Sequence, residues 1–228
     1  MSQLFQEIYP SRREIYKDEI MKEWLLGIPA GKRSESSFWQ HLTEYMRLAP
    51  DLKIEIQVSN RVDLNRSYLI EHALKQNLNL IMIDSDVLIL TKWQQLKHIL
   101  TEDFKDNDIG AIVGAVIGVN GHLLTQKPKD INAKTWLVDY GSLSFVALKH
   151  SLLEKLPVFG EYSPLGGETV KMRVTYAINT SEDIVLCQKI RGLDKKILVD
   201  SRIDLAHLQS VPLTMRNWNK RDALGVQE

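Results

Sequence analysis

The stretch that most constrains the fold is Leu78–Val87, which reads Leu-Asn-Leu-Ile-Met-Ile-Asp-Ser-Asp-Val. A short continuous apolar run of this kind predicts a strand buried on both faces, as strands are in parallel sheets. Asp84 and Asp86 follow the run, so both carboxylates are expected where open α/β sheets bind ligands, outside the carboxyl ends of the strands. Hard divalent cations prefer carboxylate oxygens, and the pair is therefore a candidate metal site.

The same pair also has a structural interpretation, in which the two aspartates open a turn and cap a helix that begins near Thr91. A second Asp-x-Asp sequence, Asp106-Asn107-Asp108, lies in a polar, turn-like stretch with no apolar strand before it. The spacing alone therefore says little, and it is the strand in front of Asp84 that favours a metal site.

The composition is that of an ordinary soluble globular protein, with 44% hydrophobic and 25% charged residues in a chain of 228. This length fits one sizeable α/β domain better than two small ones. The 29 basic and 29 acidic residues cancel, which argues against a general nucleic-acid binder but allows a local basic groove for a phosphorylated ligand. The single cysteine, Cys187, cannot form an internal disulfide, and no apolar run is long enough to cross a bilayer or resembles a signal core, so we expect a cytoplasmic protein.

Alternation and helical spacing divide the chain into strands and helices that follow one another in α/β order. We expect a peripheral arm at 1–23, followed by strands at 24–29 and 54–58 that alternate with helices at 38–46 and 64–74. The central strand comes next, and a helix at 91–104 follows it. A strand at 109–119 then meets the hairpin signal Asn120-Gly121. Two strand-like runs separated at Gly141, a helix from 149, a helix at 181–192, a strand at 197–199, an apolar run at 203–207 and a polar tail follow. Helical spacing predicts Trp93, Leu96, Ile99 and Leu100 as the buried face of the helix at 91–104, and it puts Phe38, Leu42, Tyr45 and Met46 on one face of the helix at 38–46. The order of the elements predicts a parallel sheet that carries an antiparallel addition and is flanked by helices.

Basic residues near the expected strand ends are candidates for binding phosphate. The loop 30–34 and the strand before it fail the P-loop pattern, because Gly27 and Gly31 are one residue too close together and Arg33 precedes Ser34. Lys32 and Arg33 could still contact a nucleotide, although a solvated turn explains them equally well. Arg66 lies in the first turn of a helix and Arg61 just before it, where a cation opposes the helix dipole, so either could grip a diphosphate unless it is simply solvated.

The segment 158–179 contains four Gly or Pro residues and little regular pattern, so we expect a mobile lid that closes over a ligand. Ser181 is a natural N-cap for the next helix, and the dipole stabilises acids in its first turn, so Glu182 and Asp183 have a structural explanation. His207 lies on an apolar run, where a lone histidine is more often a core residue than a ligand.

The order of these features resembles the GT-A glycosyltransferases, most of all the large family-2-type group. The likeness spans about residues 24–207 and rests on the Asp-x-Asp strand, the run Gly141–Leu148, the helix Ser181–Gly192 and the strand Lys196–Asp200 followed by His207. The resemblance implies a single GT-A domain at 24–208, with a mixed, mostly parallel sheet, an arm at 1–23 and a tail at 209–228. A UDP- or GDP-sugar would bind over the carboxyl edge of that sheet.

The resemblance also implies roles for particular residues. Asp84, Asp86 and His207 would hold Mn²⁺ or Mg²⁺, which neutralises charge on the leaving diphosphate. Asp183 would be the general base that takes the proton of the acceptor hydroxyl, and Glu182 would help to position it or the acceptor. The residues expected to bind the donor are Ile28, Pro29, Ala30, Arg61, Asn65, Arg66, Asp84, Ser85 and Gly141.

The chain departs from the family pattern at several points. The loop after the first strand appears only as Ile28-Pro29-Ala30-Gly31, and Ser59-Asn60-Arg61 stands where an aspartate often reads the base, so UDP and GDP both stay open. The aromatic motif of processive synthases is missing, which favours a soluble transferase that adds a single sugar to a glycan, a lipid-linked sugar, a protein or a small molecule. Retaining relatives share most of these features, so the stereochemical outcome stays open.

Two other classes are compatible with parts of the pattern. A sugar-1-phosphate nucleotidyltransferase shares the sheet and the metal aspartates but needs a Gly-rich loop followed by Arg and Lys, which residues 27–33 fit poorly. A non-catalytic sugar-nucleotide-binding protein on the same fold would lose the acids, whereas Asp84, Asp86, Asp183 and His207 are all present.

Overall fold

The computed structural model describes residues 23–31, 36–118, 122–130, 132–163, 168–176, 180–208 and 213–214. The expected N-terminal arm lies outside these residues apart from Glu23, and the expected C-terminal tail does so apart from 213–214. The basic pair at 32–33 and the hairpin signal at 120–121 also lie outside them. No helix in the described residues is both long enough and apolar enough to cross a membrane.

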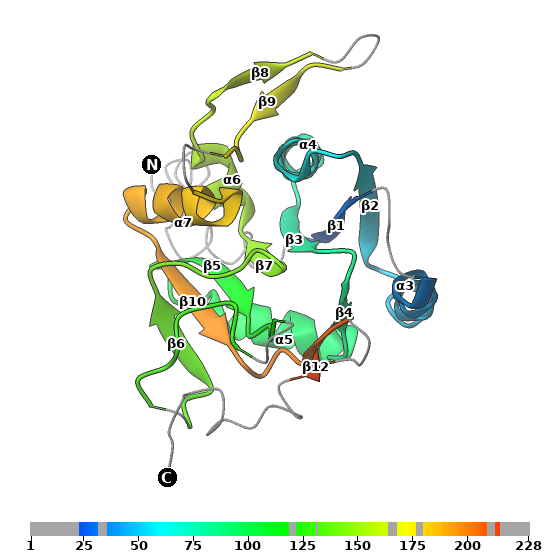
Figure 1. Cartoon of the computed structure of the whole chain (residues 1–228), viewed down its shortest axis with the longest axis vertical. Helices are drawn as coiled ribbons and strands as arrows, with labels where there is room; N and C mark the ends of the chain where they lie inside the picture. The colour runs from blue at the N-terminus through cyan, green and yellow to red at the C-terminus, as the bar shows by residue number, and fades with distance from the viewer. Residues whose placement is uncertain are drawn as a thin grey trace, which may run out of the picture.

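A seven-stranded sheet forms the centre of the molecule (Figure 1). In spatial order its strands are β2 (Lys53–Val58), β1 (Trp24–Ala30), β3 (Asn79–Ile83), β7 (Phe145–Leu148), β5 (Ile109–Gly114), β10 (Lys196–Asp200) and β6 (Thr135–Val138). β7 runs antiparallel to both of its neighbours and β6 antiparallel to β10, while the other five strands share one direction. The predicted mixed, mostly parallel α/β sheet is therefore confirmed.

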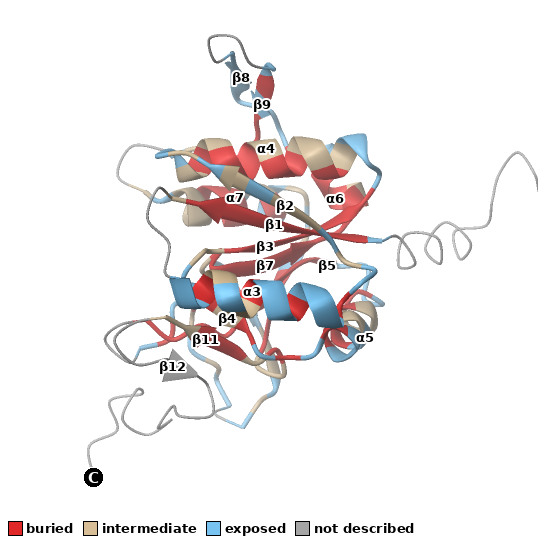
Figure 2. Cartoon of the chain, turned by 90° about the vertical axis from the view of Figure 1, so that its right-hand side faces the viewer, coloured by how far each residue is buried: buried red, intermediate tan, exposed pale blue. Residues whose placement is uncertain are grey.

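Helices cover both faces of this sheet (Figure 2). One face carries α4 (Val62–Lys75), α6 (His150–Lys155) and α7 (Glu182–Gly192), and the other carries α3 (Ser36–Leu48) and α5 (Trp93–Asp103). Each face has its own apolar cluster, and successive residues of β3 alternate between them, with Leu80 and Met82 in one and Ile81 and Ile83 in the other. The central strand is thus buried on both faces, as the apolar run predicts.

The amphipathic patterns locate the helices well and fail at one position. The predicted buried face of α5 is confirmed at all four residues, Trp93, Leu96, Ile99 and Leu100. In α3, by contrast, Met46 is 45% exposed although it was predicted to belong to the buried face. Helical geometry explains this, because Ala49 continues the buried stripe of α3 and Met46 lies at its margin.

A small three-stranded sheet lies next to the end of β3. The chain forms β4 (Val87–Ile89) directly after the Asp-x-Asp sequence, so the helix expected from Thr91 begins only at Trp93. β11 (Leu205–His207) pairs antiparallel with β4, and β12 (Leu213–Thr214) pairs with β11. This pairing brings the end of the chain's described part to the carboxyl edge of the central sheet.

The segment expected to be irregular contains a β-hairpin, which corrects that prediction. β8 (Gly160–Tyr162) and β9 (Val170–Met172) pair antiparallel and project from the body of the molecule (Figures 1 and 2). β9 alternates buried Val170 and Met172 with exposed Lys171, which is a strand pattern too short to stand out in the sequence. We call this hairpin, β8 and β9, the arm; it is distinct from the N-terminal arm expected at 1–23.

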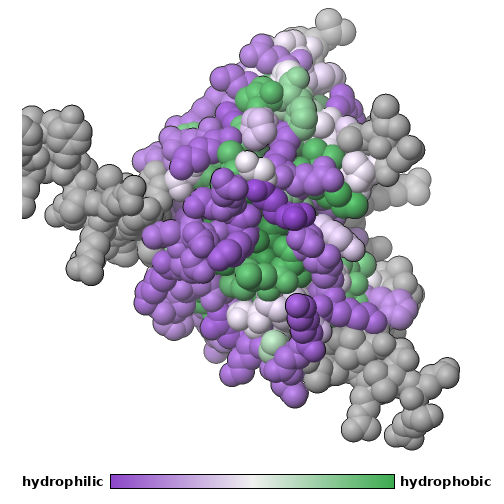
Figure 3. All heavy atoms as spheres, turned by 90° about the vertical axis from the view of Figure 1, so that its left-hand side faces the viewer, coloured by the Kyte–Doolittle hydropathy of each residue, from purple (hydrophilic) through white to green (hydrophobic). Residues whose placement is uncertain are grey.

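The two edges of the central sheet are formed by β2 and β6. The β6 edge lies on the left-hand side of Figure 1. The face that looks out on that side is mostly hydrophilic, with apolar side chains gathered near its centre and in smaller areas above it (Figure 3). Leu137 of β6 is 55% exposed, and no partner strand pairs with the outer side of β6 among the residues described.

Candidate functional site

A cleft of about 510 Å³ opens at the carboxyl ends of β1 and β3 and at the first turns of α4 and α7. This is the edge at which open α/β sheets bind ligands, because the strand ends leave a crevice bounded by helix N-termini. The residues that line the cleft are Pro29, Gly31, Ser36, Val62, Arg66, Asp84, Ser85, Asp86, Glu182 and Leu208.

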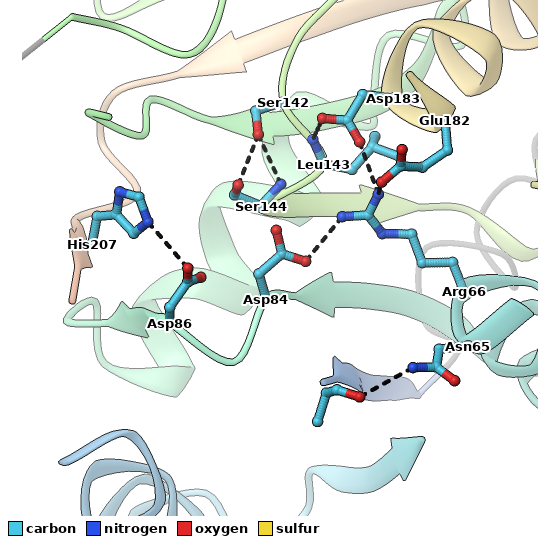
Figure 4. Close-up of polar contacts among 11 residues, drawn as sticks. Asn65, Arg66, Asp84, Asp86, Ser142, Leu143, Ser144, Glu182, Asp183 and His207 are labelled. Atoms are coloured by element: carbon cyan, nitrogen blue, oxygen red, sulfur yellow. Dashed lines mark hydrogen bonds and ion pairs between the residues drawn. The ribbon is translucent and has the colours of Figure 1, made fainter. Parts of the chain in front are cut away.

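Arg66 joins the elements around this cleft (Figure 4). Its side chain is only 3% exposed and makes ion pairs with three carboxylates. One terminal nitrogen donates to Asp84 at 2.9 Å, and the other donates to Glu182 at 2.9 Å and to Asp183 at 2.8 Å. A single buried cation from α4 therefore holds the strand-end acid and the helix-start acids together.

Asp84 is fixed by the end of β7 as well as by Arg66. Its backbone N–H donates to the carbonyl oxygen of Ser144 at 3.1 Å. Burial raises the pKa of the Asp84 carboxyl above its ordinary value, and the nearby Arg66 opposes that rise. The carboxylate lies in a partly desolvated position where a second positive charge would stabilise its ionised form.

Asp86 and His207 meet because β4 and β11 pair, with His207 opposite Val87. Nε2 of His207 lies 3.3 Å from an Asp86 oxygen (Figure 4). Its Nδ1 donates to the carbonyl oxygen of Ile117 at 3.0 Å. The bond to Asp86 raises the pKa of His207 above its ordinary value. A histidine whose Nδ1 is held by a carbonyl presents Nε2 in the orientation that metal-ligating histidines use.

The donor set is suited to a substrate-bound metal rather than to a metal held by protein alone. Within the described residues, no group of three or more His, Cys, Asp or Glu side chains is arranged to hold a metal ion, and Asp84 is bonded to Arg66. Asp86 lines the cleft and is 53% exposed, while His207 contacts Asp86 without lining the cleft itself. Mg²⁺ commonly takes one or two carboxylates and completes its shell with waters and substrate phosphates, so the residues present fit such an ion.

Glu182 and Asp183 begin α7, as predicted. Ser181 stands at the N-cap position, but its side chain makes no capping hydrogen bond to the described residues, which corrects the role expected for it. Asp183 accepts instead from the backbone N–H of Leu143 at 3.3 Å in addition to Arg66. Glu182 lines the cleft directly, and the Asp183 side chain is 27% exposed, so both acids are within reach of solvent.

Several residues expected to bind a donor make contacts within the protein and do not line the cleft. Ile28 is fully buried in the core, and Ala30 is buried with its carbonyl oxygen accepting from Asn65 at 3.1 Å. Asn65 also accepts from Ser59 at 2.7 Å, so it ties the ends of β1 and β2 to α4. None of these side chains lines the cleft.

Gly141 and Arg61 also lie outside the lining of the cleft. A Cβ added at Gly141 would meet Val113 at 2.9 Å, so close packing explains the glycine. Arg61 pairs with Asp63 at 2.7 Å and places its guanidinium 5.4 Å from the ring centre of Tyr162. Of the expected donor-binding residues, the cleft is lined by Pro29, Arg66, Asp84 and Ser85.

The cleft also contains residues that the sequence did not single out for binding. Val62 begins α4, and Leu208 follows His207 and donates its N–H to the carbonyl oxygen of Asp86 at 2.6 Å. The sequence indicates these two residues only through their neighbours, because Val62 follows Arg61 and Leu208 follows His207, both of which were expected at the carboxyl edge of the sheet.

Comparison with solved structures gives a fold likeness at low sequence identity. A197 from STIV matches with a TM-score of 0.61 and 14% identity, over 84% of this chain and 90% of that chain. A glycosyltransferase involved in the glycosylation of the major capsid of PBCV-1 gives a TM-score of 0.38 at 13% identity, over 58% of this chain and 62% of that one. UDP-glucose pyrophosphorylase complexed with UDP-glucose gives 0.41 at 10% identity, over 82% and 75%.

The first of these likenesses shows that the chain shares its overall fold with A197. At their lower TM-scores, the other two carry no information on the activity of this chain. No protein-family model matches the sequence, and no curated protein matches it either.

Proposed function

We propose that this protein is a metal-dependent glycosyltransferase that moves a sugar from a UDP- or GDP-sugar to an acceptor hydroxyl. The observation that carries the proposal is the position of Arg66, which joins Asp84 to Glu182 and Asp183 at one cleft. The two motifs that carry the family resemblance are 98 residues apart in sequence when counted from Asp84 to Glu182 (182 − 84). Because acids from both motifs bind the same arginine, they lie close enough to act on one substrate.

The diphosphate of the donor is proposed to bind beside Asp86 and His207. These two residues, with Asp84 next to them, would hold Mn²⁺ or Mg²⁺ against the phosphate oxygens. Bound there, the ion would supply charge neutralisation for the leaving nucleoside diphosphate. The nucleoside is proposed to extend toward Pro29, Gly31 and Ser36, which also line the cleft.

The acceptor hydroxyl is proposed to lose its proton to Asp183. Its second carboxylate oxygen is bonded only weakly, at 3.3 Å from the N–H of Leu143, and can take a closer donor. Glu182 shares Arg66 with Asp183 and would hold the guanidinium in place while the base works.

The test is the isosteric variant Asp183→Asn, assayed for release of nucleoside diphosphate from a panel of UDP- and GDP-sugars with Mn²⁺. Asn keeps the shape of the side chain and one acceptor oxygen, but it cannot take a proton, so we expect turnover to fall about 10²–10⁴-fold while donor affinity barely changes. Glu182→Gln is the matched control and should lower turnover less. If Glu182→Gln shows the larger loss, the base is Glu182 and the assignment to Asp183 is wrong.

The same panel tests the reaction class. A glycosyltransferase releases UDP or GDP, whereas a nucleotidyltransferase forms a nucleoside triphosphate when pyrophosphate is added. Formation of the triphosphate by the wild-type protein would contradict the proposed function.

A further inference from the structure

A second pocket, with a volume of about 840 Å³, lies at the end of α7 that points away from the cleft. α7 begins with Glu182 at the cleft and ends on the left-hand side of Figure 1, where Arg191 in its last turn lines the second pocket. The two residues are roughly 14 Å apart along the helix, at about 1.5 Å per residue. Lys196 begins β10 at the amino edge of the parallel strands and lines the same pocket, whereas the cleft lies at the carboxyl edge. The two pockets are therefore separate, and they share no lining residue.

The lining of the second pocket is rich in positively charged side chains. They come from three parts of the chain, and the five cations are Lys127, Lys129, Arg191, Lys195 and Lys196. Two acids, Asp130 and Asp139, line the pocket as well, so its net charge is +3 (5 − 2). By the same count, one cation against three carboxylates gives the cleft a net charge of −2 (1 − 3). The second pocket therefore attracts anions, in a chain whose charges cancel overall.

Gln126 fastens one wall of the second pocket to β6. Its carbonyl oxygen accepts from Nε1 of Trp136 at 2.8 Å, and its side-chain oxygen accepts from the N–H of Asp139 at 2.6 Å. These bonds hold the segment that carries two of the lysines beside the strand, while the partly buried ring of Trp136 adds an aromatic surface to the lining. Asp139 also pairs with Arg191 at 3.1 Å, so its charge is balanced within the protein.

The two lysines at the start of β10 make their bonds at the surface. Lys195 donates to the carbonyl oxygen of Asn107 at 2.7 Å, and Lys196 pairs with Asp108 at 2.9 Å. Both acceptors are exposed, and exposed pairs of this kind contribute little free energy. Either ammonium group can therefore turn to a ligand in the pocket at small cost.

We infer that the second pocket binds an oligophosphate group, a chain of two or more phosphates that is either free or carried by a nucleoside. A phosphate group carries more negative charge than a carboxylate, so a short oligophosphate balances the excess charge within the pocket. Four of the five cations are lysines, which bind phosphate as adaptable point charges. The volume lies in the range of small-molecule pockets, about 300–1,000 Å³.

A longer polyanion fits the second pocket less well. Nucleic-acid binders spread their basic residues over a stripe or a whole face, whereas here the excess charge is confined to one pocket of a chain with no net charge. Because the pocket shares no lining residue with the cleft, binding there is independent of the proposed glycosyl transfer.

Calorimetric titration of the full chain with tripolyphosphate tests the second pocket. EDTA is present, so that no divalent cation is available to the cleft, and we expect saturable binding that weakens as salt is added. Two double variants, Lys127→Gln with Lys129→Gln and Lys195→Gln with Lys196→Gln, each remove two positive charges from the lining. Each should weaken binding about tenfold, and thermal unfolding without ligand checks that both are folded.

A matched control removes the same charge elsewhere on the surface. Lys53→Gln with Lys105→Gln changes two exposed lysines that do not line the pocket, and this variant should bind tripolyphosphate as the wild type does. Asp86→Asn, in the cleft, should also leave this binding unchanged. A wild type that does not bind tripolyphosphate would overturn the inference. An equal loss of binding in the control, or a loss in Asp86→Asn, would overturn it as well, because the anion would then be held by overall charge or by the cleft.

Parallel titrations identify the source of the phosphates. Tighter binding of ATP or UTP than of tripolyphosphate would support the inference and assign the ligand to a nucleotide whose base contacts Trp136, whereas equal binding would support it and assign the phosphate chain alone. If a single-stranded DNA or a polyglutamate peptide binds through the same lysines more tightly than tripolyphosphate, the ligand is a longer polyanion and the inference is wrong.

Discussion

Two arginine–carboxylate clusters in this protein have opposite surroundings. The cleft cluster consists of Arg66 with Asp84, Glu182 and Asp183, and it opens onto the cleft. The α5–β10 cluster consists of Arg202 with Asp103 and Asp200, and none of its residues lines the cleft. Both clusters contain more carboxylates than cations, so both contain uncompensated negative charge.

The α5–β10 cluster relieves that charge with a proton. Asp200 is fully buried and accepts from Nε of Arg202 at 2.9 Å, and Arg202 also donates to Asp103. Burial, together with the neighbouring Asp200, raises the pKa of Asp103 from 3.8 to about 7. Near neutral pH the cluster therefore gains a proton that balances its charge.

The excess negative charge of the cleft cluster can be balanced by a bound ligand, since the cluster opens onto the cleft. It contains three carboxylates for one arginine, and Asp86 adds a fourth acid within the same cleft. A divalent cation brought with a diphosphate would offset this excess without protonating the proposed base. The comparison teaches that carboxylate excess indicates a binding site only where the structure also provides an opening.

The largest effect is expected from removing the shared cation of the cleft cluster. Arg66→Met leaves three carboxylates without their partner, so we expect the free energy of unfolding to fall by about 3–5 kcal/mol. Urea denaturation at neutral pH measures the change. Arg202→Met is the matched comparison and should cost less, because Arg202 is 35% exposed and Asp103 can take up a proton. An equal loss for the two variants would mean that the opening of the cleft makes no difference to the role of the arginine.

The next effect concerns the ligand that balances the cleft. With Mn²⁺ and a nucleoside diphosphate at about 100 times its Kd, the wild type should gain about 2.7 kcal/mol of stability. Asp86→Asn should abolish this gain and leave the unliganded protein folded, since Asp86 is half exposed. Asp106→Asn is the control, because that side chain only accepts the N–H of Asp108 at 2.9 Å in an exposed turn. Full stabilisation of Asp86→Asn by metal and nucleotide would exclude Asp86 as a ligand.

The smallest effect is a pH dependence in the α5–β10 cluster. Because the folded-state pKa of Asp103 is raised from 3.8 to about 7, its contribution to stability is complete below about pH 4 and is lost as the pH rises through about 7. Asp103→Asn mimics the protonated form and should be more stable than the wild type at pH 8, because it carries no buried charge next to Asp200. The expected gain is on the order of 1–2 kcal/mol, since the lost attraction to Arg202 offsets part of it. Thermal unfolding between pH 4 and 8 measures this, and parallel curves for the two proteins would show that Asp103 does not titrate in that range.

Much of the fold was predictable because strand and helix periodicities are local. The apolar run before Asp84 predicted a strand buried on both faces, and the spacing in α5 predicted its buried residues. The same local patterns placed Asp84, Asp86, Glu182 and Asp183 at a strand end or a helix start, where the structure has them. Each of these features depends on neighbours within a few positions, so a single sequence determines it.

The tertiary structure decided which of these residues meet. Arg66 reaches Asp183 across 117 positions, and His207 reaches Asp86 only because β11 pairs with β4. The arm formed where the sequence showed little pattern, because Val170 and Met172 find a buried surface against the rest of the fold. Asn65 was expected at the ligand and instead ties strand ends together. Partner choice across such separations follows from the packing of the whole sheet and its helices, which no local pattern in the sequence records.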